Sequence, residues 1–192
     1  MITTFIGPMF SGKSDKLIEV YNKIYNKDNI ICFKPVDDNR DLGVISSRNK
    51  QSQLKCYLIN RFEDILFILK GLNTPFLGKI ILIDEAQFIK GNVQYLNYLS
   101  IKLDYDIYIS GLSLTSNLKP FGCMPEILSI SDNIVKLWAH CYYCGRRADY
   151  TRCLVDKVKD VLVGNEEYIP VCKNHIDKDE IFKLIEEELN NE

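Results

Sequence analysis

The sequence lacks any apolar run approaching the roughly 20 residues that a membrane-spanning helix needs. Its opening stretch, MITTFIGPMF, also lacks the basic start and the long apolar segment of a secretory signal peptide. These absences favour a cytoplasmic protein without a membrane partner. We therefore expect its cysteines to face a reducing environment, where disulfides are rare.

A block of lysine and arginine is missing as well. The chain has 24 Lys and Arg against 26 Asp and Glu, which gives a formal net charge of −2. Because proteins that bind nucleic acid usually gather positive charge on one face, we expect no nucleic-acid partner. The 192 residues, 46% of them hydrophobic, suffice for one globular core with a small appendage.

Histidine is scarce, with only two residues, and the seven cysteines are an odd number that cannot all pair in disulfides. Two tight turns nevertheless combine them, as Cys141-x-x-Cys144 and Cys172-x-x-His175. Three thiolates and one imidazole are a typical ligand set for a structural, tetrahedral Zn²⁺. We favour zinc over a disulfide or free thiols. A redox-active C-x-x-C is disfavoured because the pair does not begin a helix after a strand.

His140 is the other histidine and directly precedes Cys141. Side chains of neighbouring residues on a strand point to opposite faces. We therefore leave His140 out of the predicted zinc ligands.

Apolar strands alternate with amphipathic helical patterns before residue 133. Strands are predicted over 2–6, 29–33, 79–88 and 106–112, and helices over 13–27, 62–72 and 93–103. This alternation predicts an α/β fold with a mainly parallel sheet flanked by helices. The polar stretch 35–53 predicts a long loop.

The pattern changes near residue 133, where short strand patterns surround the two cysteine turns and no helix intervenes. We therefore predict two domains, an α/β domain over 1–132 and a zinc-binding β-ribbon over 133–192. The second domain is predicted to end in an acidic helix from residue 178.

The segment GPMFSGKS at 7–14 matches the nucleotide-binding pattern G-x-x-x-x-G-K-[ST]. It follows a predicted strand and opens a predicted helix, as a phosphate-binding loop (P-loop) requires. Gly7 and Gly12 permit a tight loop whose N–H groups face phosphate. Lys13 can reach the β- and γ-phosphates, and the Ser14 hydroxyl can ligate Mg²⁺.

The segment ILIDEAQF supplies a second part of such a site. Asp84 ends an apolar strand, the place where P-loop proteins hold Mg²⁺ through an acid. Glu85 follows directly and points elsewhere, so it is free to take a proton from an attacking hydroxyl or water. Capping of the next loop is the alternative role for both carboxylates.

These motifs, in this order, resemble the thymidine kinase family, which combines a P-loop α/β domain with a zinc-bound lasso. The matching stretches are GPMFSGKS, DEAQF, KPFG and YCGRRADYTR…VCKNH, within residues 2–175. The resemblance implies a P-loop NTPase-like fold and a homotetramer. It also implies transfer of the γ-phosphate of ATP to the 5′-hydroxyl of thymidine or deoxyuridine.

The same resemblance assigns roles to individual residues. Glu85 is the expected base, and Lys13 and Arg40 stabilise the phosphoryl group. The ATP-binding residues it implies are Gly7, Pro8, Met9, Phe10, Ser11, Gly12, Lys13, Ser14, Asp38, Asp84 and Gln87. The nucleoside-binding residues it implies are Met9, Phe88, Leu112, Ser116, Phe121, Thr151, Lys159, Asp160, Val161, Leu162, Val163 and Tyr168. Met9 is expected to protrude toward the base, and 159–163 to form part of the lasso.

The chain departs from the family pattern away from the P-loop. Ser113 and Ser116 stand where the pattern G-L-D-x-x-F has aspartate and phenylalanine, and Val163 replaces one glycine of a pair. Arg48 and Lys50 replace a histidine and a glycine in I-x-S-H-[DN]-G. These changes bear on base selectivity and on feedback control, and they leave the phosphoryl-transfer residues untouched.

Two other functions stay open at this point. One is a P-loop NTPase in which Glu85 activates water and the zinc ribbon binds a partner. The other is a catalytically altered family member that binds nucleotide or nucleoside as a regulator.

Overall fold

The structure is a computed structural model that describes residues 1–38, 43–46, 52–72, 80–155 and 167–178, together with 182, 183, 186 and 189. Its centre is a six-stranded sheet with the strand order β5-β2-β6-β7-β1-β8, and every neighbouring pair is parallel. The strands are β1 (Ile2–Ile6), β2 (Ile30–Pro35), β5 (Tyr57–Ile59), β6 (Ile80–Ile83), β7 (Asp106–Gly111) and β8 (Asn133–Lys136). The predicted parallel α/β fold is thereby confirmed.

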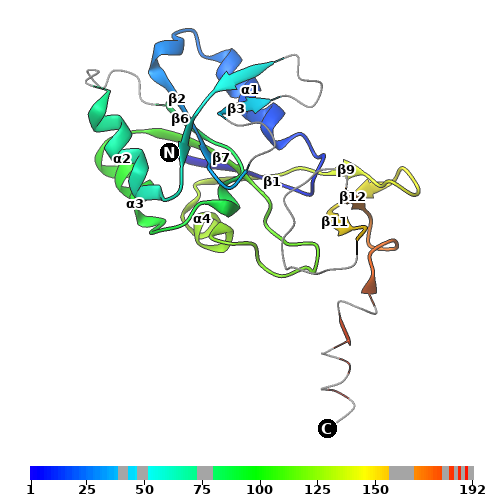
Figure 1. Cartoon of the computed structure of the whole chain (residues 1–192). Coiled ribbons are helices and arrows are strands. Elements are labelled where there is room, and N and C mark those ends of the chain that lie inside the picture. The colour runs from blue at the N-terminus through cyan, green and yellow to red at the C-terminus, as the bar shows by residue number, and fades with distance from the viewer. Residues whose placement is uncertain are drawn as a thin grey trace.

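Helices cover both faces of this sheet (Figure 1). On one face, α1 (Lys13–Lys23) and the hairpin of β3 (Val44–Ser46) and β4 (Gln53–Lys55) pack around Leu17, Ile45 and Leu54. On the other face lie α2 (Phe62–Gly71), α3 (Gln94–Asn97), the π-helix η3 (Tyr98–Lys102) and α4 (Met124–Ile130). Both clusters are buried, so the carboxyl edge of the sheet is held rigidly from two sides.

A small ribbon follows the main sheet along the chain (Figure 1). Strand β9 (Ala139–His140) pairs with β10 (Arg147–Ala148), and β11 (Tyr150–Cys153) pairs with β12 (Tyr168–Val171), both antiparallel. Its buried core consists of Ala139, Cys141, Ala148, Ile169, Val171 and Cys172. Few apolar side chains thus support this ribbon.

Several predicted element boundaries are wrong. Helix α1 ends at Lys23 because Ile24 is extended, and the short 3₁₀-helix η1 (Lys27–Asn29) follows it. The predicted strand 79–88 ends at Ile83, because Glu85 takes a left-handed conformation and the 3₁₀-helix η2 (Ala86–Phe88) begins. The predicted helix 93–103 begins at Gln94 and continues as η3.

Three further elements differ from the prediction. The predicted loop 35–53 contains β3 and the first residue of β4, because Ile45 and Leu54 are apolar enough to cover α1. Helix α4 was not predicted at all. Strand β8, which we expected in the small ribbon, is an edge strand of the main sheet. The division into 1–132 and 133–192 stays a prediction, and the acidic C-terminal helix falls largely outside the described residues.

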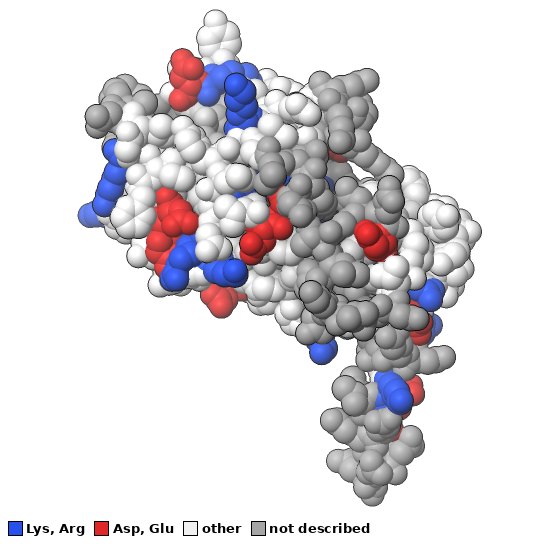
Figure 2. Space-filling model, in the orientation of Figure 1, with Lys and Arg blue, Asp and Glu red and all other residues white. Residues whose placement is uncertain are grey.

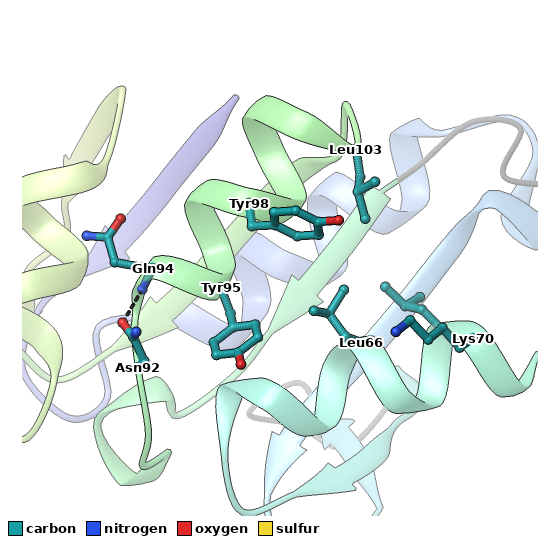
Figure 3. A pocket seen from close by; sticks show the side chains of 8 residues that line it. Leu66, Lys70, Asn92, Gln94, Tyr95, Tyr98 and Leu103 are labelled. Atoms are coloured by element: carbon teal, nitrogen blue, oxygen red, sulfur yellow. Dashed lines mark hydrogen bonds between the residues drawn. The ribbon is translucent and has the colours of Figure 1, made fainter.

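The described surface shows mixed charge and one apolar groove. Positive and negative side chains are interspersed over the described residues of the face in Figure 2. A groove of about 510 Å³ lies between Leu66 and Leu69 of α2 and Tyr95 and Tyr98 of the facing helices (Figure 3). It belongs to the face opposite α1, away from the P-loop. None of the helices in the described residues is long and apolar enough to span a bilayer.

Candidate active site

The P-loop joins β1 to α1 at the carboxyl edge of the sheet. Its path is tight, because a Cβ on Gly7 would lie 2.6 Å from the Leu137 carbonyl oxygen. Gly12 and Phe10 both have left-handed backbone conformations, with φ of 80° and 64°. Such a conformation is costly for a bulky aromatic residue and occurs mostly at functional loops. The predicted strand–loop–helix context is therefore present.

Lys13 and Ser14 occupy the first positions of α1. The Lys13 ammonium is buried and donates to the Pro8 carbonyl oxygen at 2.8 Å, within the loop itself. The Ser14 hydroxyl donates to the two Asp84 carboxylate oxygens at 3.2 and 3.0 Å. The structure thus brings together the predicted P-loop serine and the predicted strand-end acid.

Three polar side chains form a row across neighbouring strands of the sheet. Cys32, Leu82 and Tyr108 are register partners on β2, β6 and β7. Two positions later the same strands present Lys34, Asp84 and Ser110, on the face that α1 covers. We call Lys34, Asp84 and Ser110 the strand-end row.

The Asp84 carboxylate is the centre of this row. Burial and the neighbouring Glu85 charge raise the pKa of Asp84 to about 6, against the opposing effect of hydrogen bonds from Ser110 and Ser14 and of the Lys34 charge. A buried carboxylate beside a hydroxyl is a hard oxygen donor set of the kind that Mg²⁺ prefers. Ser14 and Asp84 therefore fit the predicted magnesium ion.

Glu85 is held by its own segment. The Gln87 amide nitrogen donates to a Glu85 carboxylate oxygen at 2.5 Å, and the Gln87 amide oxygen accepts the Leu112 N–H at 3.0 Å. Gln87 is buried, whereas Glu85 is half-buried. Gln87 was predicted to bind ATP, and in this structure its contacts orient Glu85.

Two residues that were predicted to line the base pocket contact each other. Phe88 and Phe121 stack edge to face with ring centroids 5.4 Å apart. Leu112 is buried next to Gln87, and Ser116 is half-buried in the turn that begins at Thr115. The Phe121 N–H donates to the Ser113 carbonyl oxygen at 3.1 Å, so the departures from the family pattern lie in the loop that carries Phe121.

The P-loop contacts the ribbon directly. The Met9 N–H donates to the Thr151 hydroxyl at 2.9 Å, and this hydrogen bond is buried. Met9 is only 9% exposed, and its predicted contact with the base stays a prediction. Tyr168 lies opposite Cys153 in the adjoining strand pair and is half-buried.

Some predicted residues lie outside the described part of the chain. These are Arg40 and the lasso residues Lys159, Asp160, Val161, Leu162 and Val163. Asp38 is described, and its carboxylate is 3.1 Å from the Lys34 ammonium, with both side chains buried. The predicted ATP ligand Asp38 is therefore paired with a cation that sequence reasoning did not consider.

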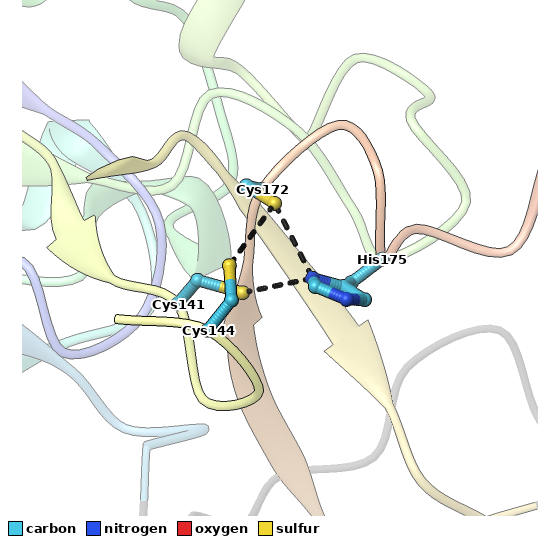
Figure 4. Close-up of side chains that lie close together, drawn as sticks. All are labelled: Cys141, Cys144, Cys172 and His175. Carbon is cyan, nitrogen blue, oxygen red and sulfur yellow. Dashed lines mark hydrogen bonds between the residues drawn. The ribbon is translucent and has the colours of Figure 1, made fainter. Parts of the chain in front are cut away.

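The four predicted zinc ligands converge in the ribbon, with all ligand atoms within 4.8 Å of one another. Figure 4 shows the three thiols and the imidazole pointing toward one centre. The Cys144 and Cys172 sulfurs are 3.8 Å apart, and His175 Nδ1 is 3.4 Å from the sulfurs of Cys141 and Cys172. A tetrahedron with Zn–S bonds of about 2.3 Å has S–S edges of about 3.8 Å. The cluster is therefore consistent with a structural zinc.

The surroundings of the cluster favour thiolate. Burial alone raises the pKa of Cys141, but backbone N–H groups of Cys172, Cys144 and Tyr143, with His175, bring it down to about 6. His140 lies outside the cluster, and its Nδ1 is 3.1 Å from the Gly145 carbonyl oxygen. Its exclusion from the ligands agrees with this geometry.

Lys34 and Ser110 were missed in the sequence although a signal exists. IICFKP and IYISGL each place one polar side chain near the end of an apolar strand, as ILID does with Asp84. In a parallel sheet such ends meet at one edge, where ligands bind. Their partnership with Asp84 depends on the register, which the sequence does not reveal.

Most of the chain is similar to proteins of one family. The family model described as thymidine kinase matches residues 1–176. The thymidine kinase of Onion yellows phytoplasma (strain OY-M) is 35% identical over 185 residues, covering 91% of this chain and 85% of its own. The thymidine kinase of Mycoplasma genitalium is 35% identical over 174 residues, covering 88% and 79%.

Among solved structures, the Thermotoga maritima RuvB Holliday junction branch migration motor aligns with a TM-score of 0.40 at 17% identity. That alignment covers 70% of this chain and 37% of RuvB. A likeness of this extent supports no conclusion about activity.

Proposed function

Because this chain belongs to the thymidine kinase family, we propose that it transfers the γ-phosphate of ATP to the 5′-hydroxyl of thymidine or deoxyuridine. The products are the nucleoside monophosphate and ADP. One observation carries the proposal: Glu85 directly follows Asp84, which accepts from the Ser14 hydroxyl, and it precedes Phe88, whose ring packs edge to face on Phe121. One short segment thus carries an acid paired with the P-loop, a candidate base and one ring of an aromatic pair.

In the proposed reaction, Glu85 accepts the proton of the 5′-hydroxyl as that oxygen attacks the γ-phosphorus. Gln87 supports this role because its amide nitrogen donates to a Glu85 carboxylate oxygen and so fixes the direction of the carboxylate. Lys13 exchanges its contact with the Pro8 carbonyl for the β- and γ-phosphates. Arg40 is proposed to stabilise the same phosphoryl group.

Magnesium and zinc have separate roles in this proposal. Ser14 and Asp84 would hold Mg²⁺, which supplies charge neutralisation at the phosphates when bound. Cys141, Cys144, Cys172 and His175 would hold zinc, which leaves no open ligand position and therefore serves the ribbon fold.

The nucleoside is proposed to lie against Phe88, Phe121 and Leu112, with Thr151 and Tyr168 on the ribbon side. Ser116 enlarges this pocket relative to the phenylalanine of the family pattern and makes it more polar. We therefore expect weaker discrimination among deoxynucleosides. The lasso residues 159–163 are proposed to read the edge of the base. A homotetramer and a cytoplasmic location are further proposals from the family.

A coupled assay of ADP release tests the reaction. The zinc-loaded protein is given Mg²⁺, ATP and each common deoxynucleoside in turn, and ADP formation is expected to depend on thymidine or deoxyuridine. Glu85→Gln should lower kcat by about 10³-fold, while Glu126→Gln, on the exposed start of α4, should retain activity. A protein that binds ATP but leaves all pyrimidine deoxynucleosides unphosphorylated contradicts the proposal.

The same assay separates the two alternative functions. ATP hydrolysis that is undiminished without nucleoside would identify an NTPase in which Glu85 activates water. Equal inactivity of wild type and Glu85→Gln, together with tight ligand binding, would identify a regulator.

A further inference from the structure

Lys34 is a lysine buried inside the sheet edge. It lies in β2, and only 4% of it is exposed. Lysine is almost never buried to this extent unless it is paired, because moving an ammonium out of water is costly. Its position therefore calls for an explanation through its partners.

Those partners flank one segment of the chain. The Lys34 ammonium is 3.1 Å from an Asp38 carboxylate oxygen and donates to the Val44 carbonyl oxygen at 3.3 Å. Asp38 precedes and Val44 follows residues 39–43 in the sequence. One buried cation thus holds Asp38 and the start of β3 together.

Lys34 is also a neighbour of Asp84. The Asp84 N–H donates to the Phe33 carbonyl oxygen at 3.1 Å, so β2 and β6 are still in contact where the strand-end row begins. The Lys34 charge lowers the pKa of Asp84, whereas burial and the Glu85 charge raise it. Lys34 is therefore paired with one carboxylate that is predicted to serve the nucleotide and is adjacent in the sheet to the strand end that carries the other.

We propose that Lys34 is a positioning residue for phosphoryl transfer, which fixes the Asp38 carboxylate beside Asp84 at the edge where the phosphates of ATP bind. This inference depends on the proposed function. A purely structural ion pair is the alternative, and the two roles make opposite predictions for a doubly substituted protein.

The experiment compares Lys34→Met, Asp38→Asn, the double variant Lys34→Met/Asp38→Asn, and Lys34→Arg. Each single change leaves one buried charge without its partner, so the melting temperature should fall by roughly 10 °C. The double variant removes both charges, and its melting temperature should recover most of that loss. Activity should behave differently.

If Lys34 acts through Asp38, each single variant should lose about 10- to 100-fold in kcat, because small displacements at a reacting centre have effects of this size. The double variant should stay as low as the worse single variant and should not multiply the two losses. Lys34→Arg, which keeps the charge, should recover at least part of kcat. KM for thymidine should change less than KM for Mg·ATP.

The outcomes that overturn the proposal are distinct. Recovery of kcat together with melting temperature in the double variant shows a structural ion pair only. Losses in kcat that multiply show that Lys34 does not act through Asp38. Lys90→Met is the matched control, because it removes the exposed partner of the adjacent Asp37 and should leave kcat within about twofold.

Failure of the proposed function is separable from failure of this inference. Binding of a non-hydrolysable ATP analogue with Mg²⁺ is measured by calorimetry on every variant, without any nucleoside. If the wild type phosphorylates no deoxynucleoside, the proposed function fails. The inference on Lys34 is then tested by binding of the ATP analogue alone. It holds if the double variant binds the analogue as weakly as the single variants, and it fails if the double variant binds like the wild type.

Discussion

The sheet edge and the zinc ribbon hold their functional side chains by different means. At the sheet edge, Lys34, Asp84 and Ser110 extend from strands buried between two hydrophobic clusters. In the ribbon, the small core includes two of the four predicted metal ligands, Cys141 and Cys172. Packing positions the first set, whereas in the second the ligands are themselves part of the core.

This difference predicts which region loses more stability when a ligand is removed. At the sheet edge the hydrophobic clusters exist independently of the predicted ligands, so we expect the fold to survive the loss of one ligand even where stability falls. We expect the ribbon to gain a large part of its stability from metal binding, since structural zinc contributes on the order of 10 kcal/mol to small domains. A buried hydrogen bond from the Met9 N–H to the Thr151 hydroxyl joins the P-loop to the ribbon.

The largest effect is expected from removal of a zinc ligand. Cys144 is exposed, so Cys144→Ala removes little packing while it removes one of four ligands. We expect zinc content to fall, hydrogen exchange to accelerate in the ribbon strands, and thymidine phosphorylation to fall by more than about 100-fold. Binding of the Mg·ATP analogue should change by less than about threefold.

Cys153→Ala is the matched control for this prediction. Cys153 lies in β11 outside the cluster and is half-buried. The Cys153→Ala protein should keep its zinc and most of its activity. Two results would contradict the contrast between the two regions. One is full zinc occupancy in Cys144→Ala, and the other is hydrogen exchange that accelerates in the main sheet as much as in the ribbon.

A smaller effect is expected from substitution of Asp84. This change should raise the stability of the protein, whereas removal of a zinc ligand should lower it. Because burial and Glu85 raise the pKa of Asp84 to about 6 from 3.8, its ionisation is penalised in the folded protein. The penalty is absent below about pH 4 and grows as pH rises through about 6. Asp84→Asn should therefore stabilise the magnesium-free protein at pH 8 by about 2 kcal/mol, and by almost nothing at pH 4.

Urea unfolding at several pH values, without added Mg²⁺, measures this difference. Asp106→Asn changes an exposed carboxylate of β7 and should show no such rise toward pH 8. The Asp84→Asn protein should also lose kinase activity. A destabilised Asp84→Asn protein at pH 8 would mean that the sheet edge needs this carboxylate for folding, as the ribbon needs its cysteines.

The smallest effect is expected at the join between the regions. Thr151→Val removes the acceptor of the buried Met9 N–H and leaves that donor without a partner. An unmade buried hydrogen bond costs about 1 to 2 kcal/mol. We expect KM for thymidine to rise about tenfold with unchanged zinc content.

Thr151→Ser keeps the hydroxyl and should stay close to wild type in the same kinetic measurement. If Thr151→Val and Thr151→Ser behave alike, the hydrogen bond does not transmit the position of the ribbon to the P-loop. The two regions would then act independently on the nucleoside.

Much of the candidate site could be predicted because its signals are local. GPMFSGKS lies on a strand–loop–helix turn, and Asp84 ends an apolar strand, as predicted. Cys141, Cys144, Cys172 and His175 were paired from their spacing alone. Each of these patterns reflects a constraint within a few consecutive residues, namely a tight loop, a strand end or a metal-binding turn.

Other features could not be predicted because they depend on distant neighbours. Strand β8 pairs in parallel with β1 and so belongs to the main sheet, although its sequence resembles the ribbon strands that follow. The hydrogen bond from the Met9 N–H to the Thr151 hydroxyl likewise joins the P-loop to a remote part of the chain.

The sequence by itself determined the α/β order, the phosphate-binding loop, the strand-end acids and the zinc ligand set. Only the tertiary structure decided that Lys34 and Ser110 stand beside Asp84, and that Gln87 orients Glu85. The physical reason is register. Alternation along a strand fixes which face a side chain takes, but only the pairing of strands fixes which side chains on that face become neighbours.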